Sequence, residues 1–126
     1  MQTTIQTEQI PAEIRIFLNH VYEYKKGIRP MVLYTLNKNH QVFVERRLQN
    51  QCIAYYIQEV SCTKINLFFG NDDCMEVIKS IVQKPLNELS PEHDFIIGAL
   101  LGYDLCRQCK RYASRVGCEP SISRVC

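Results

Sequence analysis

Two short apolar runs separated by three residues constrain the fold of this chain more than any other feature. Residues 52–60, CIAYYIQEV, lead through the turn Ser61-Cys62-Thr63 into residues 64–69, KINLFF. Both runs are rich in β-branched and aromatic residues, and their spacing is typical of a β-hairpin. Alternating apolar residues form one buried face, and Tyr56 and Phe68 lie on the other. The sequence therefore predicts a hairpin whose second face also packs under a helix or a second copy.

Further helices and one more strand are predicted around this hairpin. Gly27 follows an apolar stripe and is typical of a helix C-cap, whereas Asn71 and Ser90 are typical helix N-caps. The predicted elements, in chain order, are a helix over 11–26, a strand over 31–36, a helix over 39–50, hairpin strands over 52–60 and 64–69, a helix over 72–83, and a long helix over 91–114.

This order of elements predicts an α+β fold. Its centre is a three-stranded sheet with a ferredoxin-like β-α-β-β-α core that lacks the last strand, and an N-terminal helix and a long C-terminal helix are added to it. We expect the strand order first–third–second, which leaves the first strand on an open edge. A chain of 126 residues predicts one domain. We expect a flexible arm over 1–10, a single domain over 11–116, and a tail over 117–126.

Cysteine usage and hydropathy predict a cytoplasmic protein that does not enter a membrane. The seven cysteines are odd in number, and the polar residues 1–9 do not form a basic and apolar leader. Reduced thiols in the cytoplasm are the simplest interpretation. The longest strongly apolar stretch, residues 95–103, is far shorter than the roughly 20 residues that a membrane-spanning helix needs.

Charge is distributed unevenly along the chain. The net charge is +2, but residues 70–104 carry seven acids against two lysines, and residues 105–126 carry five basic residues against one acid. An acidic middle argues against a nucleic-acid binder, for which Tyr56 and Phe68 would otherwise be the predicted base-stacking platforms. The basic end instead suits an acidic protein partner, with contacts predicted at Arg107, Lys110, Arg111 and Arg115.

A pair of cysteines, Cys106 and Cys109, shares a face of the predicted long helix. With Cys118 from the tail they form a candidate zinc site, although only one close-spaced cysteine pair is present. As a thiol-redox pair they lie about four turns into the helix, whereas redox motifs open a helix. The third interpretation is small apolar residues on a helix face. We expect no cofactor, and zinc is the metal that the alternative would bind.

Two glycines predict close packing of the long helix. Gly98 and Gly102 are four residues apart, which lets another backbone approach. Together with the open edge of the first strand, this spacing predicts a homodimer, and burial within one chain is the alternative.

Several blocks of the sequence resemble one family. Residues 19–36, 55–60, 64–70, 74–78 and 88–112 are similar to the small bacterial domain of unknown function numbered 2023 (DUF2023), a resemblance that covers about residues 17–112. The resemblance implies a compact homodimeric α/β domain without an assigned activity. Members tend to be encoded near flavodoxins, which implies service to a redox partner. We therefore expect a non-enzymatic dimeric interaction domain that serves a flavodoxin-like protein, and a metal or thiol-redox protein is the alternative.

Overall fold

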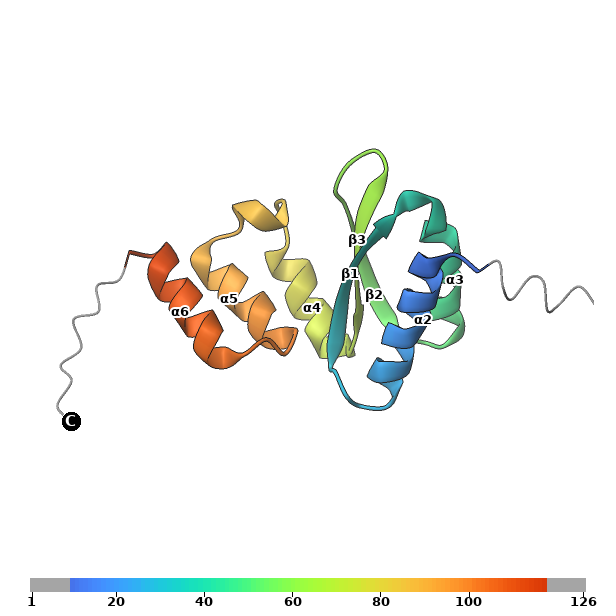
Figure 1. The fold of residues 1–126 in the computed structure, drawn as a ribbon, viewed down its shortest axis with the longest axis horizontal. Helices are drawn as coiled ribbons and strands as arrows, with labels where there is room; N and C mark the ends of the chain where they lie inside the picture. The colour runs from blue at the N-terminus through green and yellow to red at the C-terminus, as the bar shows by residue number, and fades with distance from the viewer. Residues whose placement is uncertain (1–9, 118–126) are drawn as a thin grey trace, which may run out of the picture.

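A three-stranded antiparallel sheet lies between two groups of helices (Figure 1). The computed structural model describes residues 10–117, so residues 1–9 and 118–126, which hold most of the predicted arm and tail, lie outside the described residues. The α-helices are α2 (Ala12–Lys25), α3 (Gln41–Asn50), α4 (Asp72–Ile81), α5 (Pro91–Leu100) and α6 (Leu105–Arg115), and short 3₁₀ turns lie at Lys38–His40 and Leu86–Glu88. The α+β class is confirmed.

The sheet contains β1 (Met31–Asn37), β2 (Ala54–Glu59) and β3 (Lys64–Gly70) in the order β1-β3-β2. This is the predicted order, with the hairpin strand β3 in the centre. The register pairs Thr35 of β1 and Gln58 of β2 with Asn66 of β3. β1 is an edge strand, as expected for a core that lacks a fourth strand.

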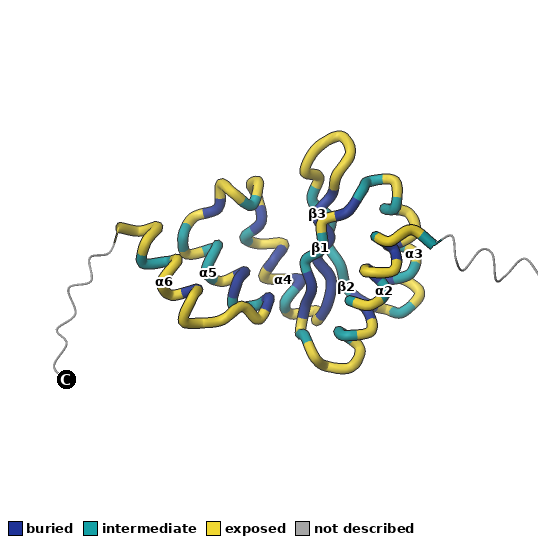
Figure 2. Tube along the Cα trace, in the orientation of Figure 1, coloured by how far each residue is buried: buried dark blue, intermediate teal, exposed yellow. Residues whose placement is uncertain are grey.

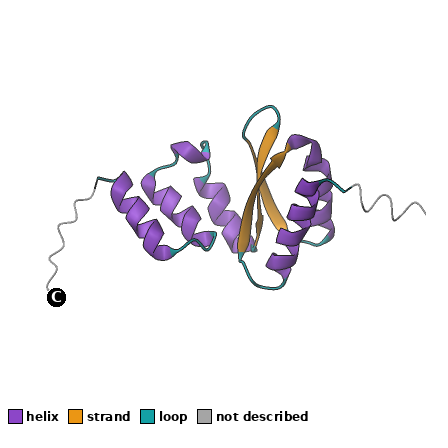
Figure 3. Cartoon of the chain, in the orientation of Figure 1, coloured by secondary structure: helices purple, strands orange, loops and turns teal. Residues whose placement is uncertain are grey.

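Both faces of the sheet are buried because β3 is apolar on both sides. Ile65, Leu67 and Phe69 face α2 and α3, whereas Phe68 faces α4 and α5. The helices therefore lie on both sides of the sheet, with α4 next to the strands and α5 and α6 beyond it (Figure 3). Helices of many α+β folds gather on one face. Here helices cover both faces, because the second face of the hairpin is also apolar and must be shielded from water.

The predicted long C-terminal helix is wrong, because the chain reverses at Gly102 and forms two helices. Gly102 has φ +83°, the left-handed conformation that glycine adopts without strain. The N–H of Tyr103 bonds to the carbonyl of Gly98, and the N–H of Gly102 bonds to that of Ala99, which is the Schellman pattern of a helix C-terminus. Asp104 then caps α6 by accepting from the N–H of Arg107 at 3.1 Å.

Three other predicted helix ends are confirmed by their hydrogen bonds. Asn71 accepts from the N–H of Asp73 at 2.8 Å, and Ser90 accepts from the N–H of His93 at 3.1 Å. Gly27, with φ +80°, ends α2. Within residues 10–117, no helix is both long and apolar enough to cross a membrane.

Candidate functional site

The outermost helix, α6, is held against α5 mainly through ion pairs and hydrogen bonds. Asp94 of α5 receives a bidentate contact from Arg111, with Nε at 2.6 Å from Oδ2 and Nη2 at 3.2 Å from Oδ1. Arg115 places Nη1 at 3.6 Å from the same carboxylate and donates from Nη2 to the carbonyl of Leu89 at 2.9 Å. Two of the four cations predicted to contact a partner are therefore engaged within the chain.

The electrostatics of this contact favour ionised Asp94. The hydrogen bond from Arg111 lowers the pKa of Asp94 below its usual value, and the positive charges of Arg111 and Arg115 add to this effect, whereas partial burial opposes it. The same contact raises the pKa of Arg111. The ion pair therefore persists at neutral pH and weakens only in acid.

Gly98 of α5 packs directly against the Gln108 side chain of α6. A Cβ atom at this position would lie 1.9 Å from Nε2 of Gln108, so the absence of a side chain makes room for the Gln108 carboxamide. Gly102 has open space around its Cα and serves instead as the helix C-cap. The structure thus provides an explanation within one chain for both glycines, and their predicted role in a dimer stays a prediction.

The opposite face of α6 is open to solvent (Figure 2). Arg107 and Lys110 are exposed, and neither side chain has an ion pair or hydrogen bond recorded with another residue in 10–117. Cys106 and Cys109 are also exposed on this helix as free thiols. The predicted partner surface is thereby reduced to two free cations beside two thiols.

An apolar groove runs between α5 and α6. It has a volume of about 340 Å³ and is lined by Glu92, Phe95, Ile96, Cys109 and Tyr112. The rings of Phe95 and Tyr112 meet edge to face at 5.9 Å, and the Tyr112 hydroxyl donates to Glu92 at 3.0 Å. The groove is therefore an apolar strip with one acidic residue, Glu92, in its wall. Aromatic residues are enriched in protein interfaces, so this strip is a candidate interaction surface.

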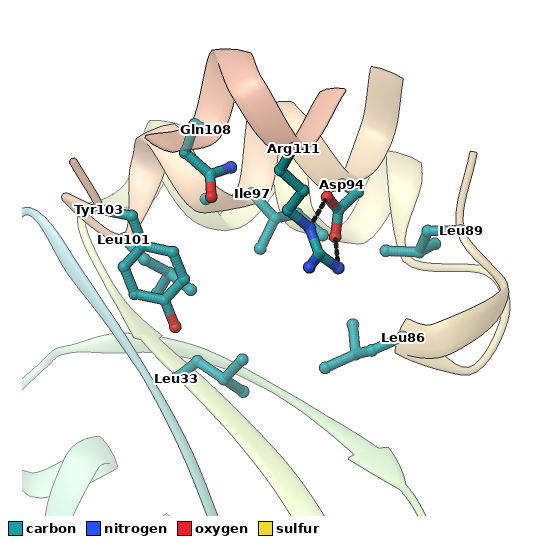
Figure 4. Close-up of a pocket in the computed structure, with 10 residues that line it drawn as sticks. Leu33, Leu86, Leu89, Asp94, Ile97, Leu101, Tyr103, Gln108 and Arg111 are labelled. Atoms are coloured by element: carbon teal, nitrogen blue, oxygen red, sulfur yellow. Dashed lines mark hydrogen bonds and ion pairs between the residues drawn. The ribbon is translucent and has the colours of Figure 1, made fainter. Parts of the chain in front are cut away.

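A second pocket lies between the sheet and the α5–α6 hairpin (Figure 4). Its volume is about 270 Å³. Apolar side chains form most of its wall: Leu33 of β1, Leu86 and Leu89 from the segment before α5, Ile97 of α5, and Leu101. Its polar groups are the Asp94–Arg111 pair, the Tyr103 hydroxyl and the Gln108 carboxamide, which approach the pocket from the helical side (Figure 4).

A comparison with protein families shows that the sheet and this helical hairpin belong to one matched unit. Residues 15–115 match the family described as Protein of unknown function (DUF2023). The chain belongs to this family. The matched range begins within α2 and ends at the last residue of α6, so α6 is part of the DUF2023 unit. This match confirms the resemblance predicted over about residues 17–112. No curated protein matches the chain.

The structure places the cysteines of this DUF2023 protein without testing the zinc alternative. Cys106 and Cys109 lie on α6, and Cys118, the predicted third ligand, lies outside the described residues. Among residues 10–117, no three histidine, cysteine, aspartate or glutamate side chains are grouped closely enough to bind a metal ion. A site that includes residues beyond 117 stays a prediction.

The predicted base-stacking platforms are covered in this DUF2023 fold. Phe68 is fully buried in the core under α4, and Tyr56 packs against it with ring centroids 6.0 Å apart. The Tyr56 hydroxyl donates to the carbonyl of Val82 at 3.4 Å. Because Phe68 has no exposed ring face, a nucleic-acid base cannot stack on it.

Sequence reasoning missed Asp94 and Gln108 as the partners that hold α6. The missed signal was the succession Gly102-Tyr103-Asp104, which places a C-cap glycine two residues before an N-cap aspartate. Interpreted as a chain reversal, this succession predicts a separate last helix that packs back against α5. The particular contact between Asp94 and Arg111 depends on the angle between the two helices, which this signal does not specify.

Proposed function

We propose that this protein is a non-enzymatic, cytoplasmic interaction domain that binds an acidic protein partner through the exposed face of α6. The observation that carries the proposal is the pair of exposed cations, Arg107 and Lys110, on a helix that also forms one wall of an apolar groove. An acidic redox carrier of the flavodoxin class has the complementary charge. Arg111 and Arg115 support the surface indirectly, because their contacts with Asp94 hold α6 in place.

The groove and the cations would serve different parts of the binding reaction. Desolvated apolar and aromatic residues supply most of the affinity of protein interfaces, so the wall of Phe95, Ile96 and Tyr112 is the expected source of it. Charges elsewhere on the exposed side of α6 mainly increase the association rate and select the partner by the sign of its charge. α6 carries no acidic residue, so its exposed side presents a uniform positive charge to an approaching acidic protein.

The experiment measures binding of the full chain to an acidic flavodoxin while salt is raised from about 0.05 M to about 0.5 M. We expect affinity to fall steeply with salt. The double variant Arg107→Glu/Lys110→Glu should bind about tenfold more weakly or worse, because two attractive contacts become repulsive. The matched control, Lys25→Glu/Lys26→Glu, changes charge equally at the end of α2 and should bind normally. Binding that is independent of salt, or equal loss in both variants, would refute the proposal.

We further propose that two copies associate through the edge of β1. The N–H of Lys38 bonds to the carbonyl of Thr63, and in an antiparallel pair only every second residue exchanges hydrogen bonds with its partner strand. Leu33 and Thr35 are the alternate residues, so their backbone N–H and C=O groups point away from β3. No backbone partner for these groups is recorded among residues 10–117. Glu13 accepts from the N–H of Asn37 at 3.0 Å and closes one end of the edge. An unpaired strand edge is a template for pairing with another chain, and an antiparallel β1–β1 pair would extend the sheet to six strands.

Substitutions at Thr35 test this dimer. Thr35→Pro removes an outward N–H at a sheet edge, where proline is tolerated, and should convert the dimer to a monomer in native mass spectrometry. Thr35→Val is the matched control, because it loses only the hydroxyl that bonds to Asn66 and retains the N–H. A wild-type chain that is monomeric at all concentrations, or a Thr35→Pro variant that remains dimeric, would exclude pairing through this edge.

A further inference from the structure

The pocket of Figure 4 is lined by a mostly buried carboxamide, that of Gln108, which has no hydrogen bond recorded with another residue in 10–117. Gln108 is 7% exposed, one of two buried polar residues in the described chain. The side-chain hydrogen bonds of α6 are made by Arg111, Tyr112 and Arg115, and none recorded within residues 10–117 involves the Gln108 carboxamide. Its N and O atoms are not among the buried atoms without a partner, so they remain open to the pocket, where a ligand can pair with them.

The position of Gln108 is maintained by its neighbours. Gly98 lies directly against the carboxamide, and a side chain there would collide with Nε2. Arg111, one helical turn further along α6, is bound to Asp94 in bidentate geometry. The contact with Gly98 and the attachment of α6 to α5 place the carboxamide at the wall of the pocket, so it needs little reorganisation to meet a ligand.

The wall of the pocket determines what kind of ligand would fit. Five aliphatic side chains favour an apolar or flat aromatic body. The lining carries one positive and one negative charge that neutralise each other, so it favours an uncharged ligand. A cavity of about 150 Å³ accommodates benzene. The volume of about 270 Å³ therefore suits a molecule of about two fused rings.

The carboxamide adds a requirement for hydrogen bonding. It presents one donor and one acceptor side by side, and this arrangement pairs with a ring edge that carries an adjacent acceptor and donor, as glutamine pairs with adenine. We propose that this pocket binds a small, uncharged, two-ring nitrogen heterocycle whose edge pairs with Gln108. This inference does not depend on the proposed partner surface, which lies on the exposed face of α6.

Adenine and indole test the proposal as matched probes. Both are uncharged two-ring molecules, but only adenine carries the adjacent donor and acceptor. Titrations of the full chain, followed by amide chemical shifts, should show saturable binding of adenine with shifts at Leu33, Ile97 and Gln108. Indole should bind at least about tenfold more weakly, the effect of losing one bidentate pair. Equal binding of both probes, or no binding of adenine up to millimolar concentration, would overturn the proposal.

Two pocket variants and one control separate Gln108 recognition from a general effect on the fold. Gln108→Met keeps the length of the side chain and removes both hydrogen-bonding atoms, so adenine affinity should fall at least about tenfold. Gln83→Met makes the same change at an exposed residue of the segment after α4 and should bind normally. Leu86→Phe narrows the opposite wall and should also reduce binding, even if Gln108→Met does not fold. Unchanged adenine affinity in either folded pocket variant contradicts the assignment.

Discussion

The two sides of the sheet are covered in physically different ways. On one side, α2 and α3 pack directly on the strands and bury Phe17, Val21, Val44 and Leu48. On the other side α4 makes the main helix contacts with the strands, α5 packs against α4, and α6 is outermost (Figure 1). The buried residue of α6 is Gln108, and no apolar side chain of that helix is buried. The first side is stabilised by apolar burial, whereas α6 is attached mainly by polar contacts.

The two sides of the sheet are therefore expected to respond differently to pH and salt. Apolar burial responds little to pH or salt, but ion pairs at a surface respond to both. Segments with few buried apolar contacts open at lower free energy than the whole domain, and binding surfaces are commonly drawn from such segments. The contrast predicts that damage to the first side unfolds the domain, whereas damage to the α5–α6 contact releases α6 alone.

The largest effect is expected from Phe17→Ala in α2. Phe17 is fully buried and packs edge to face against Phe69 at 5.8 Å. Its truncation should lower the free energy of unfolding by about 3–5 kcal/mol, measured by urea denaturation. The neighbouring Ile16 is 45% exposed, and Ile16→Ala should change stability by no more than about 0.5 kcal/mol. A comparable loss in both variants would mean that the buried core on this side does not dominate stability.

Asp94→Ala should have a smaller and more local effect. The substitution leaves Arg111 and Arg115 without their carboxylate, and these partly exposed pairs together contribute about 1 kcal/mol. Hydrogen exchange should lose protection in α6 and the end of α5 and remain unchanged in the sheet. Glu76→Ala, an exposed acid on α4, is the control and should leave exchange unchanged. Uniform loss of protection over the whole domain would show that α6 is not separately attached.

Gly98→Ala should destabilise the helical hairpin by about 1 kcal/mol. The new methyl group displaces the Gln108 carboxamide, and the cost of overpacking exceeds the gain in helix propensity. Adding Gln108→Ala removes the collision, so the double variant should be more stable than the sum of the two single changes predicts. Urea denaturation of all four proteins measures this coupling. Additive effects would rule out the close approach of α6 to Gly98.

The smallest effect is the pH dependence of the Asp94 contact. Its pKa is lowered in the folded state, so the stability that this carboxylate contributes is fully present above the unfolded value of about 3.9. That contribution is lost as pH falls through the lowered folded pKa. The stability difference between the wild type and Asp94→Asn should therefore be constant from pH 7 to about 5 and shrink below about 4. A difference that persists undiminished in strong acid would exclude the ion pair as its source.

Local signals predicted the fold, and the same kind of signal marked the break in the last helix. The hairpin and the caps at Asn71 and Ser90 are confirmed, and each depends on residues near one another in sequence. The strand order is also confirmed, although β1 pairs with the distant β3, because the order of the elements already predicted it. Gly102 and Asp104 are equally local, yet the strong apolar pattern of 95–105 favoured one continuous helix. Leu101 and Leu105 both fit the apolar stripe of one continuous helix, but Leu101 is buried against the core and Leu105 is exposed. Periodicity alone does not distinguish these two environments.

The amino-acid sequence by itself determined the three strands, the helices α2 to α4 and the central position of β3 in the sheet. Backbone preferences, caps and alternating hydrophobicity act over a few residues and can be read directly. The tertiary structure alone decided that Arg111 and Arg115 bind Asp94, whereas Arg107 and Lys110 have no ion pair recorded within residues 10–117. It also decided that Gln108 lies against Gly98 at the wall of a pocket. Contacts between helices depend on the angle at which they pack, and that angle is set by the whole core rather than by any short stretch of sequence.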